Sequence, residues 1–273
     1  METFPFFQVD AFTDRPFTGG PAAVVLLEEF LPNARLLEVA AENNLAETAF
    51  LVPLMAGRWR LRWFTPTMEV PLCGHATLAA AHVLFQEKKG VGGKVEFETA
   101  SGLMTVEALA DGWLEMDFPS LPSRPIEVTD AHCEALGARP VAVRVGHYLL
   151  AQFGSQQEIL QLRPDFARIS RLDPAGATLP GCVICVAPAS PDTQGWDVVS
   201  RFFGPGAGIN EDPATGSAHC MIAPVFSELS AREELLCFQA YPGRGAVVRT
   251  RLDGDRVRLA GQAVTVIEGR TLA

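Results

Sequence analysis

Residues 63–77 read Trp-Phe-Thr-Pro-Thr-Met-Glu-Val-Pro-Leu-Cys-Gly-His-Ala-Thr and lead into an alanine- and leucine-rich stretch that predicts a helix at 74–85. A related order returns at 201–219, which reads Arg-Phe-Phe-Gly-Pro-Gly-Ala-Gly-Ile-Asn-Glu-Asp-Pro-Ala-Thr-Gly-Ser-Ala-His. Both segments contain Phe-x-Pro, an acidic residue, and then a small residue, glycine, a polar residue and alanine where a helix starts. We interpret the recurrence as a degenerate internal duplication, and chance similarity between two glycine-initiated helices is the alternative.

The rest of the chain predicts many short strands and few helices. Apolar and polar residues alternate at 58–64, where Trp59, Leu61 and Trp63 share one face. Further strands are expected at 6–12, 22–27, 45–54, 95–99, 104–108, 114–118, 141–145, 147–153, 181–188, 197–203, 246–252 and 256–261, and helices at 33–44, 130–136, 165–172 and from 216. Because this order is not strict βαβ alternation, it predicts an α+β fold with a mixed sheet or barrel wrapped on a helix in each half.

The linker between the halves is expected at Pro119–Pro125, where prolines are dense. We therefore predict an N-terminal domain at 1–118 and a C-terminal domain at 119–261. The last segment, 262–273, is expected to pack back on the N-terminal domain.

Composition and charge exclude several classes of protein. Of the 273 residues, 48% are hydrophobic and 20% are charged, which is typical of a folded globular protein. Lys and Arg number 22 against 32 Asp and Glu, for a net charge of -10. This balance disfavours nucleic acid and anionic membranes as partners, since both require basic surfaces. The N-terminus shows no secretory signal, so a cytoplasmic location is expected.

The spacing of cysteines and histidines indicates whether the chain binds a metal ion. The six cysteines are scattered and are expected to be reduced thiols. One pair, Cys182 and Cys185, has a metal-like spacing, but it lies in an expected strand whose residues three apart point to opposite faces. His75 and His82 lie too far apart along one helix to bind the same zinc ion. The sequence therefore predicts no metal site.

The two glycine-initiated helix starts are candidate anion sites. A helix N-terminus leaves backbone N–H groups unpaired, and glycine at 74 and 216 allows a ligand to approach them. Two related turns, one from each half, would suit a small carboxylate held between two domains. Ordinary capping of the helix by Thr215 or Ser217 is the alternative.

Glu47 is the candidate for proton transfer. It is the one ionisable residue in the apolar run from Leu45 to Gly57, and burial there is expected to raise its pKa toward neutrality. His75 and Asp212, each at one of the two turns, are candidate partners. A strand-end glutamate with its carboxylate in water is the alternative for Glu47, and helix capping or core hydrogen bonding is the alternative for His75.

These motifs are similar to those of the phenazine-biosynthesis PhzF-like family, which has the diaminopimelate-epimerase-like fold. The resemblance spans nearly the whole chain. It is carried by Gln8–Phe12 with Pro21–Val24, by Asn44–Phe50, and by the segments 63–77 and 208–219. It implies two pseudo-symmetric domains, each a mixed sheet curled around a central helix, with the active site between them.

The resemblance also implies a homodimeric isomerase that needs no cofactor. Its family members in phenazine pathways isomerise a dihydro-hydroxyanthranilate by moving a proton along the ring. Matched motif by motif, it places the catalytic roles on Glu47, His75, Asp212 and Ser217. Substrate binding is expected at Cys73, Gly74, Thr215 and Gly216.

We therefore expect an isomerase that moves a proton on a small carboxylate-bearing metabolite, with Glu47 as general acid and base. The alternatives are an amino-acid epimerase or racemase that uses Cys73, and a non-catalytic homologue that binds small molecules. Thr215 stands where the related epimerases have their second cysteine, and a hydroxyl is too weak an acid for that role. The chain also departs from the family at Gly20 and at Tyr241–Ala246, which leaves the substrate open.

Overall fold

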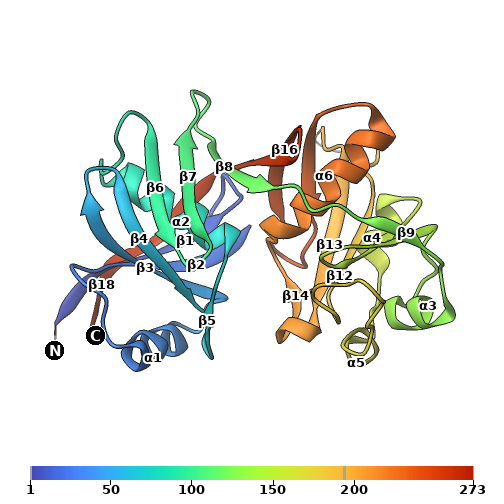
Figure 1. The fold of residues 1–273 in the computed structure, drawn as a ribbon, viewed down its shortest axis with the longest axis horizontal. Coiled ribbons are helices and arrows are strands. Elements are labelled where there is room, and N and C mark those ends of the chain that lie inside the picture. The colour runs from blue at the N-terminus through green and yellow to red at the C-terminus, as the bar shows by residue number, and fades with distance from the viewer. Residues whose placement is uncertain (1, 193–194, 273) are drawn as a thin grey trace. The chain divides into compact units, whose positions relative to one another are not determined.

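The computed structural model describes residues 2–192 and 195–272. The chain packs as two compact units (Figure 1). Unit 1 consists of Met1–Asp117 and Ala260–Ala273, and unit 2 consists of Phe118–Leu259. The chain therefore enters unit 2 once and returns to unit 1 for its last residues.

Unit 1 is a curled sheet with a helix on each face. Its helices are α1 (Asn33–Asn43) and α2 (Gly74–Gln86). Its strands are β1 (Thr3–Ala11), β2 (Gly20–Leu26), β3 (Glu47–Met55), β4 (Arg58–Phe64), β5 (Glu69–Val70), β6 (Lys94–Thr99), β7 (Gly102–Ala108), β8 (Leu114–Pro119) and β18 (Ala263–Leu272).

The helix α2 is the central element of unit 1. It is apolar on nearly all sides, and its residues from His75 to Leu84 are buried except for His82. A helix that is apolar all round must be enclosed by other elements. The strands β1, β2, β3 and β18 pack against α2. The helix α1 covers the opposite face of the sheet through Leu36 and Val39. In β4, Trp59, Leu61 and Trp63 are buried, as their alternation predicted.

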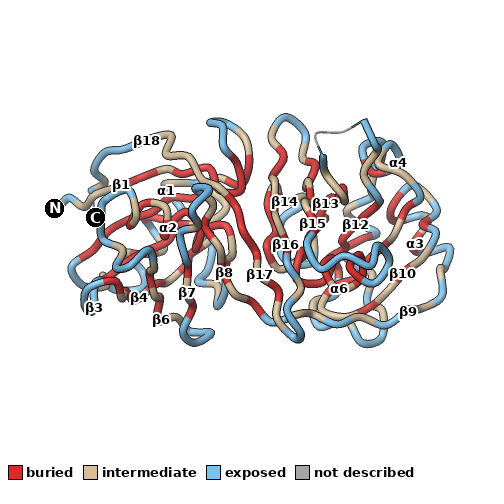
Figure 2. Tube along the Cα trace, turned by 90° about the horizontal axis from the view of Figure 1, so that it is seen from above, coloured by how far each residue is buried: buried red, intermediate tan, exposed pale blue. Residues whose placement is uncertain are grey.

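Unit 2 repeats this architecture. Its helices are α3 (Asp130–Leu136), α4 (Gln156–Gln161), α5 (Phe166–Ile169) and α6 (Gly216–Ser230), with a short 3-10 turn η1 (Pro205–Ala207). Its strands are β9 (Arg124–Ile126), β10 (Ala142–Val145), β11 (Leu149–Gln152), β12 (Val183–Pro188), β13 (Val198–Gly204), β14 (Ile209–Asp212), β15 (Glu234–Gln239), β16 (Ala246–Asp253) and β17 (Arg256–Gly261). The buried stretches in Figure 2, drawn in red, include much of α6 and the strands beside it.

Strand pairing shows that the two units share one topology. In unit 1, β1 and β2 are antiparallel, β2 and β3 are parallel across α1, and β3 and β4 are antiparallel. In unit 2, β10, β11, β12 and β13 pair in the same way, with α4 and α5 in the crossover. Both units then add a short antiparallel strand, a parallel strand across the central helix, and a further antiparallel strand. The predicted α+β fold with two pseudo-symmetric halves is confirmed.

Several elements differ from the sequence-based prediction. The helix expected at 165–172 is only the single turn α5, because Asp165 caps it and the chain turns again after Ile169. The helix α4 and the strands β5, β9, β14, β15 and β18 were not predicted. The strand β18, red in Figure 1, pairs with β1 along its whole length, from Thr3 opposite Leu272 to Ala11 opposite Ala263. Its pattern is weak because many of its residues are exposed.

Within residues 2–192 and 195–272, no helix is long and apolar enough to cross a membrane.

Candidate functional site

Glu47 is the first residue of β3 and lies beside the start of α2. The helix α1 ends when Asn44 adopts a left-handed conformation with φ 49°, which turns the chain back toward the sheet. Glu47 then pairs with Ala22 in the parallel ladder between β2 and β3. Its side chain is only 18% exposed. The carboxylate is therefore largely removed from water, unlike that of a strand-end glutamate in solvent.

His75 lies between Glu47 and Cys73. Its Nε2 atom is 2.9 Å from the Glu47 Oε2 atom, and its Nδ1 atom is 3.7 Å from the Cys73 Sγ atom. Cys73 and His75 flank Gly74, the first residue of α2, so the start of the helix positions both side chains. A thiol, an imidazole and a carboxylate thus form one row, which we call the Glu47–His75–Cys73 cluster.

The cluster contains an ion pair, and this pair reverses the expected shift of the Glu47 pKa. Burial acts to raise the Glu47 pKa, but the positive charge of His75 and the polar contacts with His75 and Cys73 outweigh it, so the pKa is lowered. Burial likewise acts to lower the His75 pKa, yet the contacts with Cys73 and Glu47 raise it well above the ordinary value. Burial and the Glu47 charge raise the Cys73 pKa to about 11, so the thiol is neutral at pH 7. Glu47 is therefore the charge that keeps His75 protonated.

Glu47 and His75 still have hydrogen-bonding capacity to spare. The Glu47 Oε2 and His75 Nε2 atoms are close but not aligned for a hydrogen bond, and among the described residues neither has another partner. Buried polar atoms without partners are uncommon in folded proteins and often mark functional positions. The Glu47–His75 pair is therefore a candidate functional position.

The corresponding turn of unit 2 is held by a buried glutamine. Thr215 donates its hydroxyl to Asp212 Oδ2 at 2.5 Å, and its backbone N–H donates to Gln239 Oε1 at 2.8 Å. Gln239, the last residue of β15, donates from Nε2 to the Asp212 carbonyl at 2.6 Å and to Thr215 Oγ1 at 3.0 Å. The side chain of Gln239 fixes the turn from both sides.

Ser217 is the third residue of this turn and is half-buried. Its Oγ atom lies 2.7 Å from the hydroxyl oxygen of Tyr148. The Tyr148 side chain is buried between Phe202 and His147, with edge-to-face contacts to both rings. Ser217 and Tyr148 therefore act as a connected pair of hydroxyl groups.

The two helix starts match in their backbone contacts as well. Thr77 donates its hydroxyl to the Cys73 carbonyl at 2.6 Å, and His219 Nδ1 donates to the Thr215 carbonyl at 2.8 Å. Neither Cys73 nor Thr215 caps its helix through its side chain. The alternative in which Thr215 merely caps α6 is therefore wrong, and the first amides of both helices remain without side-chain caps.

The Glu47–His75–Cys73 cluster is also the group in the described part of the chain whose side chains could hold a metal ion, with ligand atoms within 4.8 Å of one another. Residue spacing does not reveal this group, because Glu47 lies on β3 while Cys73 and His75 lie at the start of α2. The fit is poor, since the thiol lies at one ring nitrogen and the carboxylate at the other. A metal ion bound to one nitrogen of His75 cannot also bind both the Cys73 thiol and the Glu47 carboxylate in this arrangement.

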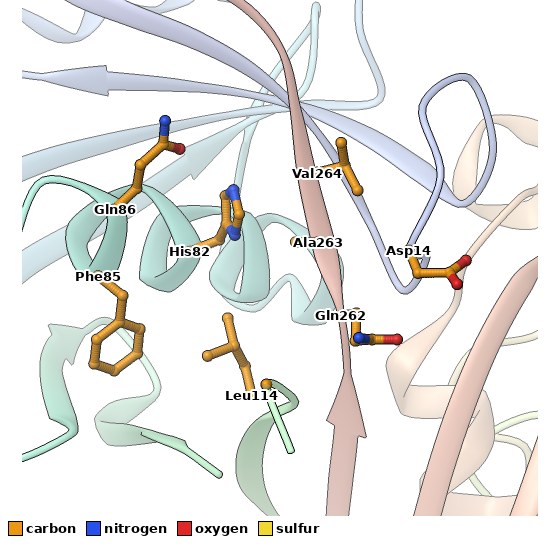
Figure 3. Close-up of a pocket in the computed structure, with 9 residues that line it drawn as sticks. Asp14, His82, Phe85, Gln86, Leu114, Gln262, Ala263 and Val264 are labelled. Carbon is orange, nitrogen blue, oxygen red and sulfur yellow. The ribbon is translucent and has the colours of Figure 1, made fainter. Parts of the chain in front are cut away.

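A separate cavity of about 340 Å³ lies in unit 1, between the second half of α2 and the start of β18 (Figure 3). Its lining comprises Asp14, His82, Phe85, Gln86, Gly112, Leu114, Gln262, Ala263 and Val264. His82 is neutral there, because burial lowers its pKa, and it hydrogen-bonds Thr265 at 3.0 Å. No candidate site residue lines this cavity, so the buried cluster at the other end of α2 is the better candidate for the chemistry.

Comparison with known proteins agrees with this geometry. The model of the phenazine biosynthesis-like protein family matches residues 9–269. The chain belongs to this family. An uncharacterized isomerase of Pseudomonas aeruginosa is 42% identical over 97% of both chains, and one of Halalkalibacterium halodurans is 40% identical over 100% of both. The crystal structure of a PhzF-family protein of Enterococcus faecalis superposes with a TM-score of 0.92 at 33% identity, covering 100% of both chains.

Membership in the phenazine biosynthesis-like family confirms the predicted fold, and the relatives confirm the isomerase class. Sequence reasoning had selected Glu47, His75 and Cys73, which the structure brings together, and Asp212, Thr215 and Ser217, which share one turn. It missed Tyr148 and Gln239. A lone glutamine at the end of an apolar strand, followed by the unusual turn at Tyr241–Ala246, was the available signal for Gln239.

Proposed function

We propose that this isomerase moves a proton between two carbon atoms of a small carboxylate-bearing metabolite, without a cofactor, and that Glu47 is the general acid and base. The observation that carries the proposal is the buried Glu47–His75 ion pair at the start of α2. A largely desolvated carboxylate is a suitable base for a carbon acid. The isomerase relatives support the reaction class.

The charges define the order of events. Glu47 is deprotonated before the substrate binds, because His75 lowers its pKa. The carboxylate takes a proton from a carbon next to an activating group, and the released electron pair forms a new double bond as the existing one shifts. Protonated Glu47 then returns the proton to another carbon. Atoms and electrons balance within the substrate, so the step needs no oxidant or co-reactant.

Stabilisation of the developing negative charge is assigned to the helix starts. The amides that begin α2 at Gly74 and α6 at Gly216 carry the partial positive charge of a helix N-terminus. We propose that His75 and Asp212 orient the substrate and that Ser217 donates a hydrogen bond to its carboxylate. Such groups contribute on the order of 10²–10⁴-fold each in rate.

A deuterium-exchange experiment tests the role of Glu47. Wild-type protein, Glu47→Gln and the matched control Glu107→Gln, which alters an exposed strand residue, are incubated in D₂O with a dihydro-hydroxyanthranilate and a panel of amino-acid carboxylates. We expect wild type and control to shift the double bond, and Glu47→Gln to lose at least about 10²-fold in rate while remaining folded. Full activity of Glu47→Gln would contradict the proposal.

The position of Cys73 supports a second candidate function, an epimerase or racemase that uses this thiol. The Cys73 Sγ atom is 3.7 Å from His75 Nδ1, so the protonated ring is placed to stabilise a thiolate that acts as the base. A pKa of about 11 and the hydroxyl of Thr215 at the matching position of unit 2 disfavour it. This candidate predicts deuterium at a stereocentre with no shift of double bonds, and complete loss of activity in Cys73→Ala.

The homodimer implied by the family resemblance is likewise a proposal. Sedimentation equilibrium of the full chain tests it, and a single species with the mass of one chain would contradict it.

A further inference from the structure

Strand register identifies which residues of unit 2 occupy the positions of Glu47 and its neighbour. Thr48 pairs with Phe64 in unit 1, and Val183 pairs with Phe203 in unit 2. The phenylalanines are equivalent, since each precedes the proline of the repeated segment by two residues. One residue back along each strand, Cys182 therefore stands where unit 1 has Glu47.

The neighbouring strand is matched in the same way. Ala23 pairs with Thr48 in unit 1, and Leu149 pairs with Val183 in unit 2. One residue back, Tyr148 stands where unit 1 has Ala22. The duplicated site thus has a carboxylate beside an alanine in unit 1, but a thiol beside a tyrosine in unit 2.

This difference separates the chemistry of the two units. In unit 1 the third residue of the turn is His75, which pairs with Glu47 at 2.9 Å. In unit 2 the third residue is Ser217, which pairs with Tyr148 at 2.7 Å. Burial raises the Cys182 pKa to about 11, so at neutral pH this position of unit 2 carries no charge. The Tyr148–Ser217 pair can donate hydrogen bonds but cannot move a carbon-bound proton as a carboxylate does.

The direction of the hydrogen bond follows from acidity and packing. A phenol is a stronger hydrogen-bond donor than an aliphatic alcohol, and burial raises the Tyr148 pKa to about 12, so its hydroxyl keeps its proton. The Tyr148 ring is 5% exposed and lies 5.0 Å from the Phe202 centroid, which restricts its hydroxyl to one place. When Tyr148 donates to Ser217, the proton of Ser217 must point elsewhere.

We propose that Tyr148 is a positioning residue that donates to Ser217 and thereby directs the Ser217 hydroxyl proton toward the substrate carboxylate. In this role the Tyr148–Ser217 pair recognises an anion and takes no part in moving the proton. The inference rests on the proposed function, because it assumes a substrate with a carboxylate. A chain of two hydroxyl groups is polarised along its length, which strengthens the outer hydrogen bond.

Binding measurements on the full chain test the inference with two probes of nearly equal shape. Anthranilate carries a carboxylate, and anthranilamide carries a neutral amide in its place. The variants are Tyr148→Phe, Ser217→Ala, the double variant, and the control Ser170→Ala, whose hydroxyl donates to the Ala167 carbonyl on the surface.

We expect Ser217→Ala to raise the dissociation constant for anthranilate by about 10–100-fold and Tyr148→Phe by about 3–10-fold. The double variant should bind no more weakly than Ser217→Ala, because Tyr148 acts only through Ser217. Anthranilamide should bind all variants alike. In assays with a carboxylate substrate that the enzyme converts, Tyr148→Phe should raise KM while leaving kcat nearly unchanged.

Other outcomes separate the two claims. Unchanged anthranilate binding by Tyr148→Phe, additive losses in the double variant, or equal losses for both probes would overturn the inference. Wild-type protein that binds anthranilate but exchanges no deuterium with any carboxylate would overturn the proposed function and leave the carboxylate contact standing. Wild-type protein that does not bind anthranilate would overturn the inference.

Discussion

At the scale of single residues, charge is set by neighbours rather than by burial alone. Glu47 and His75 are both largely removed from water, and burial by itself would make both neutral. Because they lie 2.9 Å apart, each instead favours the charged form of the other. Glu47 is therefore deprotonated before substrate binds, as the proposed reaction requires.

The first prediction concerns the His75 titration. In Glu47→Gln the neutral amide no longer stabilises the imidazolium, while burial still acts to lower the His75 pKa. We expect the His75 midpoint to lie well above 6.5 in wild type and to fall markedly in the variant. NMR of histidine-labelled protein measures it, with His75→Asn for assignment. An unchanged midpoint would show that Glu47 does not hold the charge of His75.

The same pair predicts a window of stability. The Glu47 pKa is lowered on folding. Its contribution to the free energy of unfolding is therefore complete above pH 4.5 and is lost as the pH falls through the folded pKa. The His75 pKa is raised on folding. Its contribution to the free energy of unfolding is therefore complete below pH 6.5 and is lost as the pH rises through the folded pKa. The difference in unfolding free energy between wild type and Glu47→Gln should therefore be largest between pH 4.5 and 6.5. Urea titrations across pH measure it, and a constant difference would refute the linkage.

His219 predicts a separate loss of stability in acid. Burial lowers its pKa from 6.5 to about 4, so the unfolded chain binds a proton that the folded chain rejects. Between these values wild type should lose up to about 3 kcal/mol relative to His219→Asn, whose amide can still donate to the Thr215 carbonyl. Urea unfolding at pH 7 and pH 4 compares the two proteins, and parallel losses would count against a neutral buried His219.

At the scale of elements, the β13–β14 hairpin positions the candidate site turn of unit 2. Arg201 on β13 donates to both carboxylate oxygens of Glu211 on β14, at 2.7 and 2.9 Å. The same guanidinium donates to the carbonyls of Ile159 and Leu162. Because Asp212 follows Glu211 directly, this buried pair fixes the strand from which the site turn begins.

We expect Arg201→Met to destabilise the protein by about 3–5 kcal/mol, since it leaves the buried Glu211 carboxylate without its partner. The control is Arg168→Met, which removes an exposed pair with Glu134 and should change stability by no more than about 1 kcal/mol. Urea unfolding of both variants gives the comparison. Equal effects would show that the buried pair is not what secures the hairpin.

At the scale of the whole molecule, one unit is continuous and the other is not. Unit 2 is formed by a single stretch of chain, whereas unit 1 needs residues 260–273 to complete its sheet. The strand β18 pairs with β1 from Thr3 to Ala11 and packs against α2. Removal of β18 exposes one side of the central helix that carries His75.

A truncation after Gly261 should therefore unfold unit 1 selectively. We expect unit 2 to keep its NMR signals, while signals from α2 and its strands collapse and limited proteolysis cleaves within residues 2–117. The control lacks only residues 271–273, which removes the end of the ladder, and it should stay folded. Retention of unit 1 in the longer truncation would show that β18 is dispensable.

Local patterns determined much of the architecture. The glycine-initiated helices at 74 and 216, the end of α1 at Asn44 and the buried face of β4 were all predictable, because each depends on a few neighbouring residues. The repeated turn and the family motifs also selected Glu47, His75 and Ser217. The strand β18 was missed, since its ladder with β1 joins opposite ends of the chain and leaves little periodic pattern.

The tertiary structure alone decided how those residues act on one another. Neither the contact of Glu47 with His75 nor the bonds of Gln239 and Tyr148 to the second turn follow from spacing, because they join separate strands to a helix start. For the same reason, the pKa of Glu47 was predicted to rise, whereas in the structure it is lowered. A sequence can indicate that a group is buried, but Coulomb energy depends on distance, and only the folded chain sets the distance between two charges.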